Sequence, residues 1–280
     1  MTPSLRADFL THAGPVQHRG RAGARVGVAV AALVFASYIG GLVVLGVTPA
    51  RIFAGLGRLG TIIGLMMPPW PASSAHVPTY LGALGQTLAI AFLGTSLAGV
   101  FALPLGFLAA RNVVAGRVLH FLARRTLDSV RSVDTLIWAL IWINVVGLGP
   151  FAGALAIAST DLAALAKLMS EAIETADDGP VEAVLASGGG WLAMMRFGIL
   201  PQVLPVFASQ ALFFFESNTR SATIIGIVGA GGIGLYLSEM IRVLEWREAA
   251  FLILLVLVAV AVIDAVSRRL RAAIMGVRGS

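Results

Sequence analysis

The residues best suited to bind a charged solute lie in the run FFFESNTRSAT, inside a long apolar stretch of this 280-residue chain. Glu216 and Arg220 are four residues apart, which places them on one helix face and lets them pair. An arginine also binds oxyanions through two parallel hydrogen bonds. Two interpretations stay open: a structural ion pair that holds helices or two copies of the chain together, or a path for an oxyanion. The path candidates are Glu216, Ser217, Asn218, Thr219 and Arg220, with Asn144 on an earlier helix.

The glycine run VGAGGIG is a second candidate for binding, because three of its glycines satisfy G-x-G-x-x-G. That pattern binds a dinucleotide when it follows a strand and opens a helix in a soluble βαβ unit. Here it follows an apolar stretch of membrane length, and the chain has no Walker A motif, so we expect no nucleotide site. Two conformational roles stay open: close helix packing, or a gate or helix break near the outer mouth of a path, formed by Gly229, Gly231, Gly232 and Gly234.

Five carboxylates gather in one loop of a chain that is otherwise poor in charge: Glu171, Glu174, Asp177, Asp178 and Glu182. No basic partner, histidine or nucleophile stands beside them, so the pattern indicates a solvated loop and not an acid–base or metal site. The chain has no cysteine, and its four histidines lack the spacing of metal ligands. We therefore expect no catalytic residue and no metal.

The elements that position these residues are predicted to be membrane-spanning helices. The chain is 58% hydrophobic and 12% charged, whereas average globular chains are roughly 25% charged. Its net charge of +6 is not gathered into a basic patch, which argues against nucleic acid as a partner. Apolar runs of sufficient length predict spans at residues 26–47, 80–110 and 249–266. Another apolar stretch, residues 203–237, is too long for one helix and is broken by the glycines at 229–234, so it predicts one further span.

One further apolar run, residues 135–160, is interrupted by the sequence GLGP. Because Gly and Pro are the strongest local breakers, a hairpin of two helices, residues 133–149 and 151–169, competes with a single helix. The hairpin gives six spans, and cytoplasmic loops carry the excess of Lys and Arg, so both termini are expected in the cytoplasm. Six spans place thirteen arginines on that side: Arg6, Arg19, Arg21, Arg25, Arg111, Arg117, Arg124, Arg125, Arg131, Arg268, Arg269, Arg271 and Arg278.

This topology predicts an all-α integral membrane protein with four parts. These are a cytoplasmic segment at residues 1–25, a first span with an external stretch at 26–79, a core at 80–268 with a cytoplasmic loop at about 170–202, and a cytoplasmic tail at 269–280. The external stretch, residues 48–79, is either an amphipathic interfacial helix or a plain loop. Asp161 lies near a predicted span end and is expected at the interface. If its helix begins near Val203, Glu216 lies about 20 Å along it, past the middle of the bilayer.

The cytoplasmic loop contains two predicted short helices. Gly179 and Pro180 end one helix and begin the next, and the glycines at 188–190 stop that helix because Gly adopts the conformation of a C-cap. An apolar and basic stretch, residues 191–197, follows. Two short helices that project from a membrane fit a groove on a partner protein; a loop without a partner is the alternative.

Five residues of this loop carry a resemblance to a known family. Glu182–Ala183, then Gly188, then Leu200–Pro201 resemble the E-A-A…G…I-x-L-P loop of the permease subunits of bacterial ABC importers. In that family the loop forms coupling helices that dock on the ATPase subunit, so the resemblance implies the same role for these five residues. Two positions depart from the pattern: Val184 replaces the second alanine, and Gly198 stands where isoleucine is usual.

A closer resemblance covers the C-terminal half, from GLGPFAG onward, whereas residues 1–80 offer no comparable match. The strings FGILPQVLP, FESNTRSAT and IVGAGGIG are similar to the phosphonate-type importer permeases, which share the fold of the methionine-importer permease. The resemblance implies an inner-membrane homodimer that transports phosphonate or a related phosphorus oxyanion. The partners that it implies are two cytoplasmic ATPase subunits that bind ATP and Mg, a periplasmic or lipid-anchored substrate-binding protein, and membrane lipid.

Three other functions remain as alternatives. The first is an ABC permease for another small solute, such as methionine, because the path residues do not encode a substrate. The second is an ion-coupled secondary transporter that uses Glu216 and Arg220, although such proteins often contain repeated halves and neither the loop nor the glycine run occurs twice. The third is a membrane scaffold that moves nothing.

Overall fold

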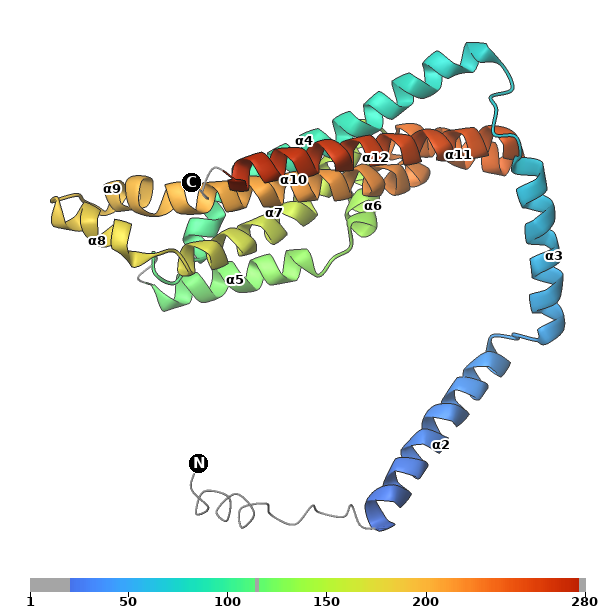
Figure 1. The fold of residues 1–280 in the computed structure, drawn as a ribbon, viewed down its shortest axis with the longest axis horizontal. Coiled ribbons are helices and arrows are strands. Elements are labelled where there is room, and N and C mark those ends of the chain that lie inside the picture. The colour runs from blue at the N-terminus through green and yellow to red at the C-terminus, as the bar shows by residue number, and fades with distance from the viewer. Residues whose placement is uncertain (1–20, 114–115, 277–280) are drawn as a thin grey trace, which may run out of the picture. The chain divides into compact units, whose positions relative to one another are not determined.

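The computed structural model describes residues 21–113 and 116–276, and regular structure throughout these residues is helical (Figure 1). The all-α prediction is therefore confirmed. The chain divides into two units, one ending at Gly64 and the other beginning at Leu65.

The first unit consists of two helices joined by a tight turn. Helix α2 (Arg21–Val44) is the predicted first span, and α3 (Pro49–Met66) follows it and ends just inside the second unit. Gly46 adopts a φ of 63° at the turn, and its carbonyl accepts a hydrogen bond of 2.9 Å from the Arg51 guanidinium. Residues 49–66 of the stretch 48–79 are thus helical and not a plain loop, and their interfacial position stays a prediction.

The second unit begins its regular structure with a short 3-10 turn, Ser74–His76, and then builds a helical bundle. Its helices are α4 (Val77–Ala109), α5 (Arg117–Arg131), α6 (Thr135–Val146), α7 (Pro150–Glu174), α8 (Asp178–Ala186), α9 (Trp191–Ala193), α10 (Leu200–Ile225), α11 (Ile233–Arg242) and α12 (Trp246–Gly276). Two π-helical turns flank α10, Met194–Ile199 before it and Gly226–Ala230 after it.

Five helical segments among the described residues are long and apolar enough to cross a membrane: Arg25–Val44, Ser74–Ala109, Pro150–Glu174, Trp191–Ala230 and Trp246–Ile274. A sixth crossing needs α5 and α6 together, which meet at an angle of 89°. The predicted hairpin does break at GLGP, where Gly147 and Gly149 have positive φ and Pro150 begins α7. Its first helix was predicted too long, however, because α6 has only 12 residues, about 18 Å, and cannot span a bilayer alone.

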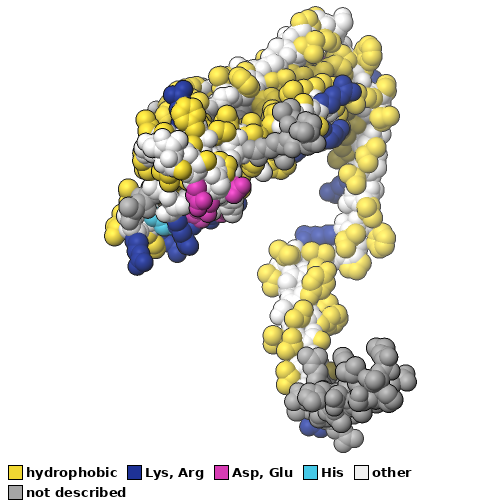
Figure 2. Space-filling model, turned by 60° about the vertical axis from the view of Figure 1, so that its left-hand side comes forward, with side chains coloured by type: hydrophobic (Ala, Val, Ile, Leu, Met, Phe, Trp, Pro, Cys, Tyr) yellow, Lys and Arg dark blue, Asp and Glu magenta, His cyan; other side chains and the backbone are white. Residues whose placement is uncertain are grey.

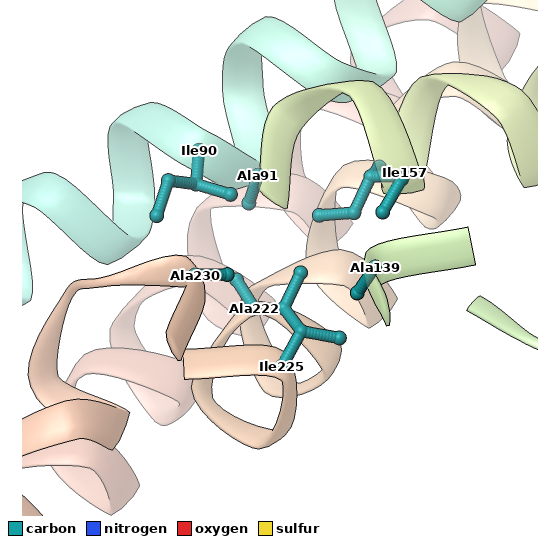
Figure 3. Close-up of a cluster of buried hydrophobic side chains, with 8 residues drawn as sticks. Ile90, Ala91, Ala139, Ile157, Ala222, Ile225 and Ala230 are labelled. Atoms are coloured by element: carbon teal, nitrogen blue, oxygen red, sulfur yellow. The ribbon is translucent and has the colours of Figure 1, made fainter. Parts of the chain in front are cut away.

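The core of the bundle forms where α4 and α7 pack closely through small residues. A Cβ added to Gly94 would lie 2.7 Å from the Ile157 Cβ, and one added to Gly106 would lie 2.6 Å from the Met169 Cβ. Small residues at such contacts let the helix backbones approach. Figure 3 shows the adjoining cluster, to which α4, α6, α7, α10 and the π-helical turn after α10 contribute Ile90, Ala91, Ala139, Ile157, Ala222, Ile225 and Ala230.

Ion pairs and hydrogen bonds connect the beginning of α12 to the beginning of α4. The His76 Nδ1 lies 2.7 Å from the Glu248 Oε1, and the same oxygen accepts a hydrogen bond of 3.3 Å from the Ala72 backbone N–H.

The surface of the molecule carries many hydrophobic side chains. Figure 2 shows them over much of the visible face, and the visible acidic side chains gather in one place beside a histidine. A surface of this kind suits contact with lipid.

Candidate functional site

The centre of the candidate site is the Asn218 side chain, which joins three helices inside the bundle. Its amide nitrogen donates a hydrogen bond of 2.8 Å to the Thr95 hydroxyl of α4 and another to the Asp161 carboxyl of α7. All three residues are buried. Because an unpaired polar group is costly in an apolar interior, this triad fixes the positions of α4, α7 and α10 relative to one another.

The close packing of α4 and α7 explains why the triad can form. Thr95 follows Gly94, whose missing side chain lets the two helix backbones approach at Ile157, one turn before Asp161. Thr95 and Asp161 are therefore both within reach of Asn218 on α10. Sequence analysis placed Asp161 at the membrane interface, and this was wrong: Asp161 lies in the middle of α7 and is buried.

Glu216, two residues before Asn218 on α10, has a nearer partner than the one predicted. Its Oε2 lies 3.0 Å from the Arg271 Nη2 of α12, whereas its Oε1 lies 3.8 Å from the Arg220 Nη1. The Glu216 and Arg271 side chains are 11% and 22% exposed, and the Arg220 side chain is 51% exposed. The i, i+4 spacing therefore predicted a real but secondary contact, and the arginine on α12 could not be found from local spacing.

The predicted depth of Glu216 also needs correction. Helical structure does not begin at Val203 but at Trp191, and it continues through the π-helical turn and Pro205 into α10. Arg271 lies near the end of α12, 25 residues after Trp246, so Glu216 lies beside the last turns of that helix. The distance of about 20 Å counted from Val203 therefore does not give the depth of Glu216, and the pairing with Arg271 lowers the cost of placing its charge in apolar surroundings.

The other path candidates occupy different surroundings. Thr219 is buried and donates its hydroxyl to the Phe215 carbonyl, while Ser217 is half-buried. Asn144 is exposed on α6, and its amide donates a hydrogen bond of 2.8 Å to the Leu140 carbonyl of its own helix. The structure thus brings Asn218 and Thr219 inside the bundle and leaves Arg220 and Asn144 on its surface.

The glycine run ends the long helix. Gly229, Gly231 and Gly232 have φ values of 110°, 81° and 72°, a region that residues with a side chain rarely adopt. The freed backbone groups find partners: the Gly232 N–H donates to the Gln86 Oε1 and the Ile233 N–H to the Thr87 Oγ1, each at 2.8 Å. Gln86 and Thr87 were not found from the sequence, since nothing local marks a side chain that completes a break 146 residues away.

Close packing occurs in the same run, so the two interpretations describe different glycines. Gly234 does not have a positive φ, but a Cβ added there would clash with the Thr223 carbonyl oxygen and lie 3.0 Å from the Gly226 Cα. The break is therefore formed by Gly229, Gly231 and Gly232, and Gly234 allows α11 to pack against the end of α10.

The loop before α10 forms one short helix attached to a long one. Helix α8 begins after Asp177, whose carboxylate accepts a hydrogen bond of 3.1 Å from the Gly179 N–H. It ends at Ala186, two residues before Gly188, which has a φ of 82°. The predicted second short helix is not separate, because residues 191–199 run into α10. Glu182 and Ala183 are exposed on α8.

Two contacts attach α8 to the beginning of α10. The Gln202 side chain donates to the Asp177 carbonyl at 3.0 Å and accepts from the Asp177 N–H at 2.9 Å. Gly198 lies against Val181, and a Cβ added to Gly198 would be 3.1 Å from the Val181 Cα. The glycine that departs from the family loop pattern therefore has a packing reason. Leu200 is half-buried and Pro201 is exposed at this junction.

Comparison with known proteins identifies the family. The model of the binding-protein-dependent transport system inner membrane component family matches residues 102–275, which is more than half of the chain. The chain belongs to this family. The matched range begins within α4 and ends within α12, so it contains α8, the glycine break, and Asp161 and Asn218 of the triad, while Thr95 lies just before it.

Two curated relatives of this inner membrane component are themselves named as permeases. The chain is 37% identical over 217 residues to the phosphite transport system permease protein PtxC of Stutzerimonas stutzeri, covering 78% of each protein. It is 37% identical over 236 residues to the phosphate-import permease protein PhnE of Mycolicibacterium smegmatis, covering 84% of this chain and 44% of the relative. The prediction of a transport permease subunit is confirmed.

The fold of the component is shared with a methionine transporter of known structure. An inward-facing conformation of the MetNI methionine ABC transporter matches with a TM-score of 0.63 and 20% identity, covering 72% of this chain and 99% of that chain. The predicted similarity to the methionine-importer permease fold is thereby confirmed.

Among the described residues of this family member, no group of three or more His, Cys, Asp or Glu side chains is arranged to hold a metal ion.

Proposed function

We propose that this permease pairs with a second copy of itself to form the translocation pathway of an ATP-driven importer for phosphonate, phosphite or phosphate. The substrate class rests on the relatives, which are named for phosphite and phosphate transport. The pathway candidates are the half-exposed or exposed polar residues of α10 and α6, namely Ser217, Arg220 and Asn144, held in place by the Glu216 pair and the Asn218 triad. The break at Gly229, Gly231 and Gly232 acts as the outer gate.

The observation that carries the proposal is the attachment of α8 to α10. Two exposed residues of α8, Glu182 and Ala183, are offered to a partner, while Gln202 and Gly198 hold α8 against the helix that carries the polar residues. A motor that moves α8 therefore moves α10. The partners are two ATPase subunits in the cytoplasm, which bind ATP and Mg, and a periplasmic or lipid-anchored protein that delivers the solute at the outer face.

This arrangement requires α8 on the cytoplasmic side, with both termini on that side as well. The arginine distribution supports this orientation, since Lys and Arg are enriched in cytoplasmic loops. In the described part of the chain, the exposed arginines of α5 and of the end of α12 then lie on the side of α8.

Two loop glycines offer a matched test of the coupling role. Gly188 has a φ of 82°, whereas Gly190 has a φ of −78°, and neither has another atom within 4 Å of an added Cβ. We expect Gly188→Val to distort the end of α8, at a cost of roughly 1–2 kcal/mol for a left-handed residue, and Gly190→Val to be tolerated. Measured in the complex of permease, ATPase and binding protein, Gly188→Val should reduce solute-stimulated ATP hydrolysis severalfold.

The substrate class is tested in the same complex. Phosphite, inorganic phosphate and methylphosphonate should each be imported into proteoliposomes in an ATP-dependent way, and methionine should not.

Two outcomes would contradict these expectations. A Gly188→Val complex that assembles normally and keeps full solute-stimulated ATP hydrolysis contradicts the coupling role. Uptake that requires an ion gradient and no ATPase supports a secondary transporter instead.

A further inference from the structure

The exposed face of α10 carries a charged residue that lipid would not accept. This face follows a spacing of four and three residues: Phe213, Arg220, Ile224 and, in the turn after α10, Ile227 are exposed, and Ser217 between them is half-buried. A 3.5-residue repeat of this kind is typical of a helix that faces another helix or a shared seam. Because α10 lies within a membrane-spanning segment, Arg220 has to face protein or water.

Glu216 would normally compete for Arg220, because residues four apart on a helix pair readily. The structure gives Glu216 another cation. Arg271 of α12 donates a hydrogen bond of 3.0 Å to the Glu216 Oε2, and its guanidinium carbon lies 6.0 Å from the centre of the Phe213 ring. Arg220 approaches Glu216 only to 3.8 Å and does not form such a bond.

The charges of these three residues do not cancel. Two arginines and one glutamate leave one positive charge, and Arg271 and Glu216 are the two members that are hydrogen-bonded and largely buried. The remaining charge is carried by Arg220, whose side chain is the most exposed of the three. A Glu216 whose charge is neutralised by Arg271 does not repel an anion from Arg220.

We propose that Arg271 neutralises Glu216 and thereby leaves Arg220 free to contact the phosphorus oxyanion in the pathway. The inference rests on the proposed function and assigns it a specificity-determining residue, Arg220, and a positioning residue, Arg271. A guanidinium binds a phosphorus oxyanion through two parallel hydrogen bonds. Because the Arg220 side chain is exposed to water, its contact with the oxyanion is weak, which suits a solute that has to be released. A second copy of the chain supplies a second Arg220.

Space beside this face fits a small oxyanion. An open hollow of about 320 Å³ adjoins the exposed face of α10 at Phe213 and is lined by Ser209, Gln210, Phe213 and Arg271. An anion that leaves Arg220 along α10 thus enters a region with hydroxyl, amide and guanidinium donors.

The test separates the three residues by import kinetics. Phosphite and methylphosphonate uptake would be measured in proteoliposomes with the ATPase and the binding protein, for the wild type, Arg220→Gln, Arg271→Gln, and the double variant Glu216→Gln with Arg271→Gln. Arg220→Gln should raise KM at least fivefold with a smaller change in kcat. Arg271→Gln should do the same, because Glu216 then pairs with Arg220. The double variant should return KM to within about twofold of the wild type.

The matched control is Arg268→Gln, which removes an arginine of α12 that pairs with Asp264 one turn earlier on its own helix. It should leave KM unchanged. Arg220→Gln keeps the bond between Arg271 and Glu216 and alters an exposed position, so it remains informative even if the Arg271 variants fail to assemble. An unchanged KM for Arg220→Gln overturns the inference, as does a double variant that assembles but transports no better than Arg271→Gln. A wild-type complex that imports another solute but no phosphorus oxyanion overturns the proposed function as well.

Discussion

Replacing Asn218 by leucine should destabilise the bundle far more than the same exchange at Asn144. Leucine fills a similar volume but donates no hydrogen bond, so the Thr95 hydroxyl and the Asp161 carboxyl both lose the donor that they share. A buried group left unpaired costs about 1 kcal/mol for the neutral hydroxyl and about 2 kcal/mol for the carboxyl. The expected loss in the free energy of unfolding is therefore about 3 kcal/mol.

Thermal unfolding of the purified protein in detergent measures this loss. For a unit of about 200 residues, 3 kcal/mol corresponds to a fall in Tm of roughly 6–12 °C. Asn144→Leu should change Tm little, because that amide is exposed and bonds only within its own helix. The double variant Asn218→Leu with Asp161→Leu should recover part of the loss, because it removes the unpaired carboxyl. If Asn218→Leu and Asn144→Leu unfold at the same temperature, the triad does not hold the three helices together.

Two further substitutions test the packing and the helix break. Gly94→Val should prevent α4 and α7 from packing, since its Cβ would lie 2.7 Å from the Ile157 Cβ. Gly85→Val on the same helix is the control, because a Cβ there has open space. The yield of folded protein after size-exclusion chromatography compares the two variants, and equal yields would contradict the close contact. Thr87→Val should remove the acceptor of the Ile233 N–H and lower the unfolding free energy by about 1 kcal/mol. Thr160→Val is the control, because the Thr160 hydroxyl donates only to the Ala156 carbonyl of its own helix. If the Thr87→Val and Thr160→Val proteins unfold at the same Tm, the helix break needs no side-chain support.

The spans and the helix breaks could be predicted because their causes are local. Long apolar runs mark α2, α4 and α12, and Gly with Pro marks the turn before α7. The run of glycines marks the end of the long helix, since only Gly adopts three such backbone conformations in four residues without strain.

The partners of the polar residues could not be predicted, because they lie on other helices. The i, i+4 rule pointed from Glu216 to Arg220, but Arg271, 55 residues away, is closer. Asp161 looked interfacial because it lies between apolar runs of ordinary length, and only the packing of α4 on α7 reveals that it is buried beside Asn218. The length of α6 was misjudged for another reason: a bend of 89° separates it from α5, and Asp134 caps its beginning through the Leu136 N–H.

Asn218 is bonded to α4 and α7, so the helical segment from Trp191 to Ala230 would turn about this residue if it rotated as a rigid rod. Gln202, where α8 is attached, is 16 residues before Asn218, and Gly229 is 11 residues after it, so the two arms are about 24 Å and 17 Å long at ~1.5 Å per residue. A rocking of about 5° would shift the α8 end by about 2 Å and the glycine end by about 1.5 Å in the opposite direction. In such a rotation, inward displacement at the α8 end accompanies outward displacement at the glycine end, so the two ends of the segment cannot move inward together.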